Sequence, residues 1–204
     1  MYRFSIIASS ILCLGALQTV AQTLSIEDLR AQIDNRVDTM NPYAELLNDP
    51  DPVRSMAAIQ IMLESGDEVL EDMALEFGLL SPNPKVRRTA FEAYLKTEPN
   101  LTVRLDGTEA TKYYMNRMDD LGAAVDSERV GYFVLPIGSY VPERECYTKR
   151  GDDICAVVSN GDGVFIYATN LKGRGTLIED GTISGSTSLY YVKESVPFNI
   201  RLIE

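Results

Sequence analysis

The chain has 204 residues, of which 45% are hydrophobic and 24% are charged, and its formal net charge is −11 at pH 7. This composition is that of a globular protein with enough apolar residues for a core, and the acidic balance argues against binding to nucleic acids or anionic lipid surfaces. Histidine is absent, which removes the commonest general base and the commonest metal ligand.

The first 21 residues have the features of a secretory signal peptide. Arg3 supplies a basic start, residues 6–17 are apolar, and residues 19–21 (T-V-A) offer small side chains for cleavage after Ala21. The apolar run is shorter than the ~20 residues that a membrane span needs. We therefore expect an exported protein, periplasmic or extracellular, with no membrane span after cleavage. Removal of Arg3, the one charged residue of this segment, takes the formal charge from −11 to −12.

A helix is expected to begin at Ser25. Ser25 as N-cap and Asp28 three residues later have the spacing of a capping box. Apolar residues then recur at helical spacing, at Ile26, Leu29, Ile33 and Val37. We expect this helix, residues 25–36, to cap one end of the helical region that follows.

Residues 46–57 and 79–90 are similar at an offset of 33 residues. Each copy has a Leu-Leu pair, a loop rich in Pro, Asp and Asn, and then Val-Arg with an alanine three residues after the arginine. In each loop an N-cap residue, Asp51 or Asn83, precedes a proline at the first helical position. The pattern predicts an antiparallel helix pair used twice, with residues 67–80 as the first helix of the second pair.

Residues 40–97 resemble the HEAT-repeat family on these motifs: leucines that end one helix, an Asp/Pro turn, and a second helix that opens with Val-Arg-x-x-Ala. The resemblance implies a short stack of helical repeats in which Arg54 and Arg87 fix the turns by pairing with turn acids. Such stacks usually need about three repeats. We therefore expect the C-terminal region, or its first helix, to cap the second end of the stack.

The character of the chain changes after Pro99, where strand and turn signals begin. The expected elements are a strand at 101–105, a helix at 109–121, and strands at 130–135, 154–159, 164–168, 176–179, 182–184, 188–192 and 198–203. The segment N-G-D-G (160–163) predicts a hairpin turn between two of these strands. The fold class is therefore α+β, with a helical domain at 22–99 and a β domain at 100–204 that has one leading helix and forms a small antiparallel sandwich or barrel.

Cys146 and Cys155 are the two cysteines that remain after signal cleavage, and in an exported chain we expect them to form a disulfide. A two-residue turn at Arg150-Gly151 would place the cysteines opposite each other on a non-hydrogen-bonded strand pair, with Cα atoms ~4.5 Å apart. The R-G-D triplet at this turn resembles an adhesion motif, but the sequence favours a simpler explanation, in which glycine supplies the turn conformation and its neighbours are solvated charges. The spacing of the cysteines argues against a redox pair or a metal site.

No catalytic, metal or cofactor site stands out. Without histidine there is no Ser-His-Asp or Cys-His arrangement, and acidic residues are too abundant for one carboxylate pair to stand out. Some tyrosines of the β region either pack at the edge of the core or form a binding face: Tyr132, Tyr140, Tyr167, Tyr190 and Tyr191. The sequence favours a non-catalytic protein-interaction or envelope-accessory protein with a protein partner. The alternatives are a carbohydrate- or cell-wall-binding module, or a carboxylate-dependent hydrolase.

Overall fold

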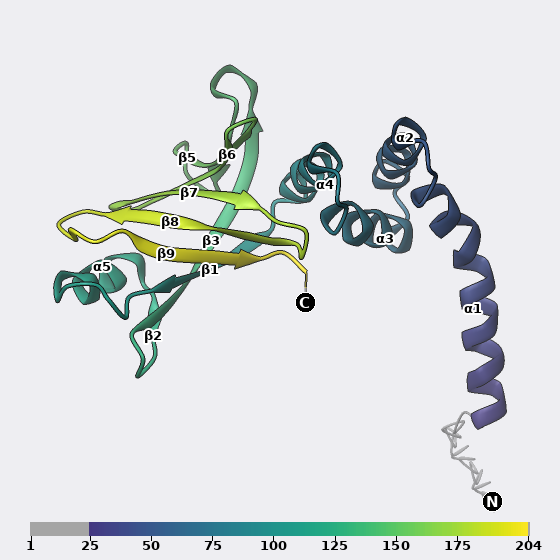
Figure 1. Cartoon of the computed structure of the whole chain (residues 1–204), viewed down its shortest axis with the longest axis horizontal. Helices are drawn as coiled ribbons and strands as arrows, with labels where there is room; N and C mark the ends of the chain where they lie inside the picture. The colour runs from purple at the N-terminus through teal and green to yellow at the C-terminus, as the bar shows by residue number, and fades with distance from the viewer. Residues whose placement is uncertain (1–24, 204) are drawn as a thin grey trace, which may run out of the picture. The chain divides into compact units, whose positions relative to one another are not determined.

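The computed structural model describes residues 25–203, and the predicted signal peptide (residues 1–21) lies outside them. The chain divides into two compact units, Met1–Pro42 and Tyr43–Glu204. The described residues contain five α-helices, one short 3₁₀ helix and nine strands (Figure 1). None of the helices in this part of the chain combines the length and the apolar character that crossing a bilayer requires.

Helix α1 (Ile26–Leu47) begins with the predicted cap. The Ser25 hydroxyl accepts a hydrogen bond from the Asp28 backbone N–H at 3.1 Å and donates to the Asp28 carboxylate at 2.7 Å. The helix continues through Pro42 to Leu47 as one element, where the sequence predicted two. Its predicted apolar stripe is exposed in the described structure, with exposed fractions of 67, 49, 51 and 50% at Ile26, Leu29, Ile33 and Val37.

The next three helices begin where the turn chemistry predicts. Helix α2 (Pro52–Leu63) is capped by Asp51, whose carboxylate accepts from the Val53 N–H at 2.9 Å. Helix α4 (Pro84–Lys96) is capped in the same way by Asn83, which accepts from the Lys85 N–H at 3.0 Å. Between them lies α3 (Glu68–Leu79), capped by Asp67. Each cap satisfies backbone donors that a helix leaves unpaired in its first turn.

Small residues allow α3 and α4 to pack closely. A Cβ atom placed on Gly78 of α3 would lie 2.5 Å from the Cβ of Ala90 of α4, which is too close for two carbon atoms. A second cluster of buried side chains joins α2 to its neighbours and includes Leu47, Ile59, Met62, Ala74 and Val86. The helices therefore form a continuous packed layer from Leu47 to α4.

The C-terminal region forms an eight-stranded antiparallel barrel. Its elements are β1 (Asn100–Asp106), α5 (Tyr113–Leu121), β2 (Ala124–Val125), β3 (Val130–Val141), η1 (Pro142–Arg144), β4 (Cys146–Lys149), β5 (Cys155–Asn160), β6 (Gly163–Ala168), β7 (Leu171–Leu177), β8 (Thr182–Leu189) and β9 (Val196–Arg201). The strand order is β1-β9-β8-β7-β6-β5-β4-β3, and β3 pairs with β1 to close the ring, while the short β2 also pairs with β3. The expected α+β class is confirmed, and the fold is the barrel rather than the sandwich.

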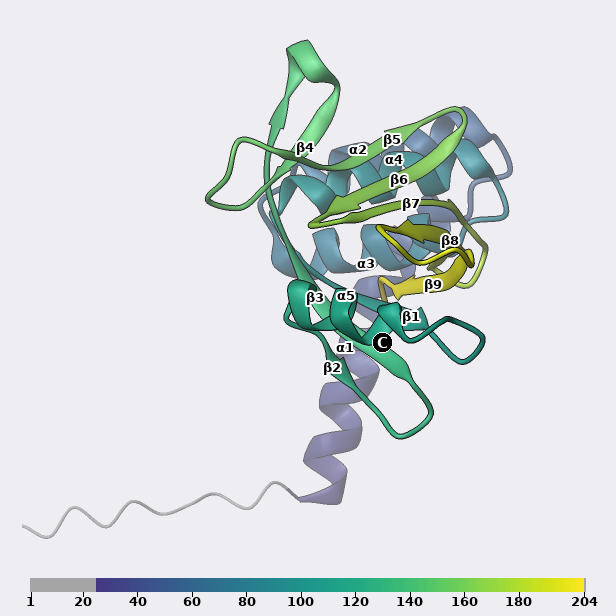
Figure 2. The same cartoon turned by 90° about the vertical axis from the view of Figure 1, so that its left-hand side faces the viewer.

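Side chains fill the barrel and join it to the helices. Every second residue of β7 and of β9 is buried, as expected when alternate residues of a strand point into a barrel. Helix α4 lies against one end of the barrel and α5 against the other (Figures 1 and 2). Phe91 and Leu95 of α4, and Tyr114 and Met118 of α5, belong to the same buried cluster as the strands. The Tyr114 hydroxyl also donates to the Leu105 carbonyl oxygen of β1 at 3.1 Å.

Some element boundaries differ from the predicted ones. Strand β8 is continuous where two short strands were expected, and β7 begins at Leu171, inside a glycine-containing segment that was not predicted as strand. The reason is tertiary: Gly175 pairs with Gly185 in the barrel wall, where the strands approach too closely for side chains. The N-G-D-G hairpin is confirmed, because Asn160 pairs with Gly163 and accepts a hydrogen bond from the Asp162 N–H at 2.9 Å. Helix α5 is shorter than predicted and begins at Tyr113.

We expect Gly185→Ala to destabilise the protein by about 1–3 kcal/mol, the usual cost of overpacking a core. A Cβ atom at this position would lie 2.1 Å from the Arg174 carbonyl oxygen and 2.5 Å from the Gly175 Cα, and backbone atoms cannot move aside as a flexible side chain would. The matched control is Gly161→Ala, because a Cβ atom on Gly161 meets nothing within 4 Å. Urea unfolding measures both; equal stability of the two variants would contradict this account of β7 and β8.

Candidate functional site

The two cysteines of the barrel are joined by a disulfide, with their Cα atoms 5.7 Å apart. The predicted register around them is wrong, because Cys155 lies opposite Thr148 rather than opposite Cys146. The Lys149 N–H donates to the Ile154 carbonyl oxygen at 2.9 Å, so the loop between β4 and β5 is longer than a two-residue turn. A β-bulge in β4 or β5 accommodates the difference in register. The disulfide is compatible with an exported protein.

The R-G-D triplet anchors this loop to the barrel. The Arg150 N–H donates to the Pro136 carbonyl oxygen at 2.9 Å. The Arg150 guanidinium donates to the Asn100 side chain at 3.2 Å and to the Glu98 carbonyl oxygen. The arginine is therefore directed back onto the start of β1, which explains the triplet by structure rather than by adhesion.

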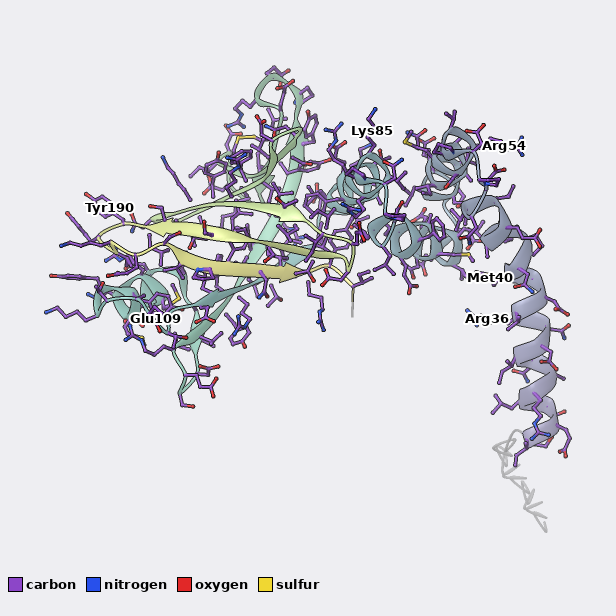
Figure 3. The ribbon with its side chains drawn as sticks, viewed as in Figure 1. Arg36, Met40, Arg54, Lys85, Glu109 and Tyr190 are labelled. Carbon is purple, nitrogen blue, oxygen red and sulfur yellow. A yellow bond between two sulfur atoms is a disulfide. The ribbon has the colours of Figure 1, made fainter. Side chains whose placement is uncertain are left out.

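The two arginines of the repeat turns are both engaged near their turns. Arg54, labelled in Figure 3, donates from Nε to the Asp49 carboxylate at 2.7 Å. A hydrogen bond from the Asp51 N–H, and then the bond from Arg54, hold the pKa of Asp49 below its usual value. Arg87 is only 8% exposed and donates to the carbonyl oxygens of Ser81, at 2.6 Å, and of Leu177 in β7, at 3.3 Å. Arg87 thus connects a helical turn to the barrel.

The tyrosines of the predicted binding face lie on separate parts of the barrel. Tyr132 and Tyr140 belong to the same strand but are eight residues apart, or about 26 Å along an extended strand. Tyr190 and Tyr191 follow the end of β8, with ring centroids 4.1 Å apart, and Figure 3 labels the first of them. Tyr167 lies on β6 and lines a cleft. A tyrosine-based face for a partner or a carbohydrate stays a prediction.

An apolar groove lies on the helical layer, between the end of α1 and α2. Its volume is about 370 Å³, and its apolar walls are Tyr43, Leu46, Ala57, Ala58, Ile61 and Leu70. Leu46 is 47% exposed and Ile61 is 70% exposed, which is unusual for side chains of this size. The Asp49–Arg54 ion pair contributes to the rim of this groove. We call this surface the helical groove.

One feature of the α2 sequence indicates the helical groove, namely the spacing of its two isoleucines. Ile59 and Ile61 are two residues apart on α2, and residues at that spacing point to different sides of a helix. Ile59 is fully buried, so Ile61 is left on a face that the fold does not cover. The predicted repeat turns at Asp51 and Arg54 lie at one end of the same helix.

A second cleft, of about 230 Å³, lies in the wall of the barrel. Its apolar side chains include Leu121, Phe133, Val134, Leu135, Ile154 and Tyr167, and its charged side chains are Asp120, Lys149 and Asp152. Asp120 is paired with Arg117 at 2.7 Å and accepts a hydrogen bond from Asn170 at 3.3 Å. Lys149 and Asp152 form no ion pair with another side chain in the part of the chain that the structure describes. We call this site the wall cleft.

Neither surface has the arrangement of a catalytic or metal centre. Among residues 25–203, no group of three or more acidic or cysteine side chains is placed to hold a metal ion. Burial in the core raises the pKa values of Tyr94, Tyr114 and Tyr147. The pKa of the exposed Tyr190 is raised mainly by a hydrogen bond with the neighbouring Tyr191.

Comparisons with models of protein families, with curated proteins and with solved structures each found no match to this chain.

Replacing both cysteines of the disulfide with serine should lower the free energy of unfolding by about 2–3 kcal/mol, because the disulfide closes a loop with a sequence separation of 9 residues. Urea unfolding of the double variant, and of the wild-type protein with and without reductant, measures the effect. Identical unfolding curves in all cases would mean that Cys146 and Cys155 are not linked in the folded protein.

Alkaline pH should weaken the contact between β4 and α4 through Tyr147. Its hydroxyl donates to the Glu92 carbonyl oxygen at 2.9 Å, and burial, with Glu92 and Tyr140 nearby, raises the pKa of Tyr147 to about 12. Below the pKa of tyrosine in the unfolded chain, near 10, the phenol is protonated in both states and the free energy of unfolding does not depend on its titration. Stability should then fall between pH 10 and 12, by up to about 1.4 kcal/mol for each pH unit.

Tyr147→Phe should keep the fold and lose less stability between pH 10 and 12 than wild type does. The remaining loss comes from Tyr94 and Tyr114, whose pKa values burial also raises. At neutral pH the variant should be less stable by about 1 kcal/mol, the usual contribution of one hydrogen bond. Unfolding by urea across the alkaline range, compared with wild type, gives the difference. Curves that fall in parallel from neutral to alkaline pH would show that Tyr147 is not the group responsible.

Proposed function

We propose that this chain is an exported, non-catalytic protein-interaction module that binds an amphipathic helix of a partner protein in the helical groove. The observation that carries the proposal is the exposed apolar groove lined by Leu46 and Ile61, because a contiguous apolar surface rimmed by polar residues is typical of an interaction site. The resemblance of residues 40–97 to HEAT repeats, whose helical surfaces bind other proteins, points the same way.

The shape of the groove favours a helix as its occupant. The groove is lined by the last turn of α1, by α2 and by Leu70 of α3. An apolar surface shared by several helices is the kind of groove in which an amphipathic helix docks. Ala57 and Ala58 are small, which allows the ridge of an approaching helix to come close to α2. A partner helix with leucine or isoleucine on one face would bury Leu46 and Ile61.

The charge around the groove favours a basic partner. Glu45 and Asp67 are exposed and stand close in sequence to the groove residues Leu46 and Ser65. The charged side chains that line the groove, Asp49 and Arg54, form an ion pair with a nitrogen–oxygen distance of 2.7 Å and therefore neutralise each other. Cleavage after Ala21 would remove Arg3 and no acidic residue, so the formal charge of the mature chain would change from −11 to −12. We therefore expect lysine or arginine on the flanks of the partner helix, which would raise the rate of association more than the affinity.

An exported location, periplasmic or extracellular, belongs to the same proposal. Its supports are the signal-like segment at residues 1–21 and the disulfide between Cys146 and Cys155, because disulfides persist in oxidising compartments. In that setting the barrel would act as a stable support for the helical layer, and the partner would be another protein of the envelope.

A synthetic helical peptide tests the groove. The probe has leucines at positions i, i+3, i+4 and i+7 and lysines on both flanks, and its binding to the purified protein is measured by fluorescence anisotropy. Ile61→Gln should weaken binding by about tenfold or more, because burying an isoleucine side chain contributes about 1.5–3 kcal/mol.

The matched control is Val53→Gln. Val53 is 69% exposed and Ile61 is 70% exposed, both lie on α2, but only Ile61 lines the groove. Val53→Gln should leave the affinity within about twofold, since a surface change away from the contact has little effect. Equal loss in both variants, or equal binding of a scrambled peptide with the same composition, would rule out the helical groove as the site.

A further inference from the structure

The register of β1 and β3 shows which backbone groups of β3 point away from β1. The Ile137 N–H donates to the Pro99 carbonyl oxygen, and the Gly107 N–H donates to the Arg129 carbonyl oxygen, just beyond the two ends of the ladder. Bonded and non-bonded pairs alternate in an antiparallel ladder, so the odd-numbered residues of β3 bond to β1. Val134 is even-numbered and lies opposite Thr102, and its N–H and C=O therefore point toward the other edge of β3.

Among residues 25–203, no strand pairs with the other edge of β3 at Val134. Pairing with β2 ends at Tyr132, which lies opposite Ala124, and pairing with β4 begins only at Ile137, which lies opposite Lys149. On the far side of the wall cleft, the pairing of β5 with β6 ends at Ile166, so the last residues of β6 also extend past their neighbour. The ladder of the barrel wall is interrupted at this point.

Two observations support this orientation of the β3 backbone. The Pro136 carbonyl oxygen, which has the same parity as Val134, accepts a hydrogen bond from the Arg150 N–H on the β4 side. Pro136 itself has no N–H. Proline is tolerated at this position because its nitrogen points away from β1, so the ladder between β1 and β3 loses no hydrogen bond. The Val134 side chain is 58% exposed and lines the wall cleft. In the part of the chain that the structure describes, neither the Val134 N–H nor its C=O has a backbone partner on this side, so the cleft contains a strand edge with one free donor and one free acceptor.

The side chains of the cleft suit a short peptide. Leu121 and Ile154 offer apolar contacts, while Lys149 and Asp152 provide one positive and one negative group. Buried backbone groups are costly without partners, but an extended peptide carries the matching donor and acceptor on a single residue. A saccharide would usually stack on an aromatic ring, and Tyr167 and the buried Phe133 are the only aromatic side chains that line this cleft within the described residues.

We propose that the wall cleft binds a short extended peptide segment, which adds to β3 as a strand at Val134. One residue of the peptide donates its N–H to the Val134 carbonyl oxygen and accepts the Val134 N–H. Its neighbours along the peptide lie beside Lys149 and Asp152, and an apolar side chain packs on Ile154. This site is separate from the helical groove and does not depend on the function proposed for that groove.

The experiment uses the isotope-labelled, purified protein and nuclear magnetic resonance. The probe is the blocked tripeptide acetyl-Thr-Val-Thr-amide. Its control is the same tripeptide N-methylated at every residue and ended in a dimethylamide, so that it has no backbone N–H to donate in any register. The free tripeptide should shift the Val134 amide and slow its exchange with water. The N-methylated control should bind about tenfold more weakly or not at all.

Two variants separate strand addition from general contact. Val134→Pro removes the N–H that faces the cleft, and the fold should persist because that N–H takes no part in the ladder with β1. It should weaken tripeptide binding by about tenfold, whereas Val134→Thr, which keeps the N–H and the branched shape, should leave it within about twofold. If Val134→Pro fails to fold, the N-methylated control alone decides.

Three outcomes would overturn the proposal. They are equal binding of the free and the N-methylated tripeptide, no shift of the Val134 amide at millimolar tripeptide, or wild-type binding by a folded Val134→Pro protein. A chito-oligosaccharide that shifts the same amides while the tripeptide does not would assign the wall cleft to carbohydrate instead. Loss of helical-peptide binding in Ile61→Gln has no bearing on these results, so the two sites are tested independently.

Discussion

The pairing of β1 with β3 is the constraint on which the rest of the structure depends. Seven residue pairs, from Asn100 opposite Pro136 to Asp106 opposite Val130, close the barrel. The ladder joins segments about thirty residues apart, and it brings Leu101, Val103 and Leu105 into the interior. The pairing begins shortly after the end of α4, because the Pro99 carbonyl oxygen already accepts a hydrogen bond from the Ile137 N–H. The closed ring is what holds α4 and α5 at opposite ends.

The helical layer and the barrel support each other through a small number of polar contacts. Arg87 joins the turn before α4 to β7, and Tyr147 joins β4 to the C-terminal part of α4 through the Glu92 carbonyl oxygen. Phe91 and Leu95 fill the apolar space between these two contacts. The helical groove on α2 therefore belongs to a helical layer that α4 attaches to the barrel. This attachment provides the rigid support that a binding surface needs.

The features that could be predicted from the sequence are those decided by neighbouring residues. The caps at Ser25, Asp51 and Asn83 and the Asn160–Gly163 turn depend on side chains within a few positions of the backbone that they satisfy. The disulfide followed from the count of cysteines. Its register did not, because the Arg150 N–H bonds to Pro136 of β3, outside the hairpin, and the Lys149 N–H then closes a loop longer than two residues by bonding to Ile154.

The candidate sites could be predicted only in part: the spacing of Ile59 and Ile61 indicates that one of them is uncovered, but which surfaces stay open depends on the fold. The exposure of Ile61 follows from how α2 meets α3, and the free edge at Val134 follows from where β2 ends and β4 begins. The glycines of β7 predict a loop when the sequence is considered alone. Their role becomes clear only from the partner strand, because Gly175 lies opposite Gly185 and the close approach of the two strands requires residues without side chains. Both failures have one cause, which is packing between segments distant in the chain.

The filled interior of the barrel has a consequence for the kind of ligand this protein can hold. Leu105, Ile137, Ile166, Ile183 and Ile200 are fully buried, and helices cover both ends. Eight strands give a barrel interior just wide enough for side chains to fill, and in residues 25–203 these buried side chains occupy it. Both candidate binding surfaces accordingly lie on the outside of the packed core, where a ligand can exchange directly with solvent.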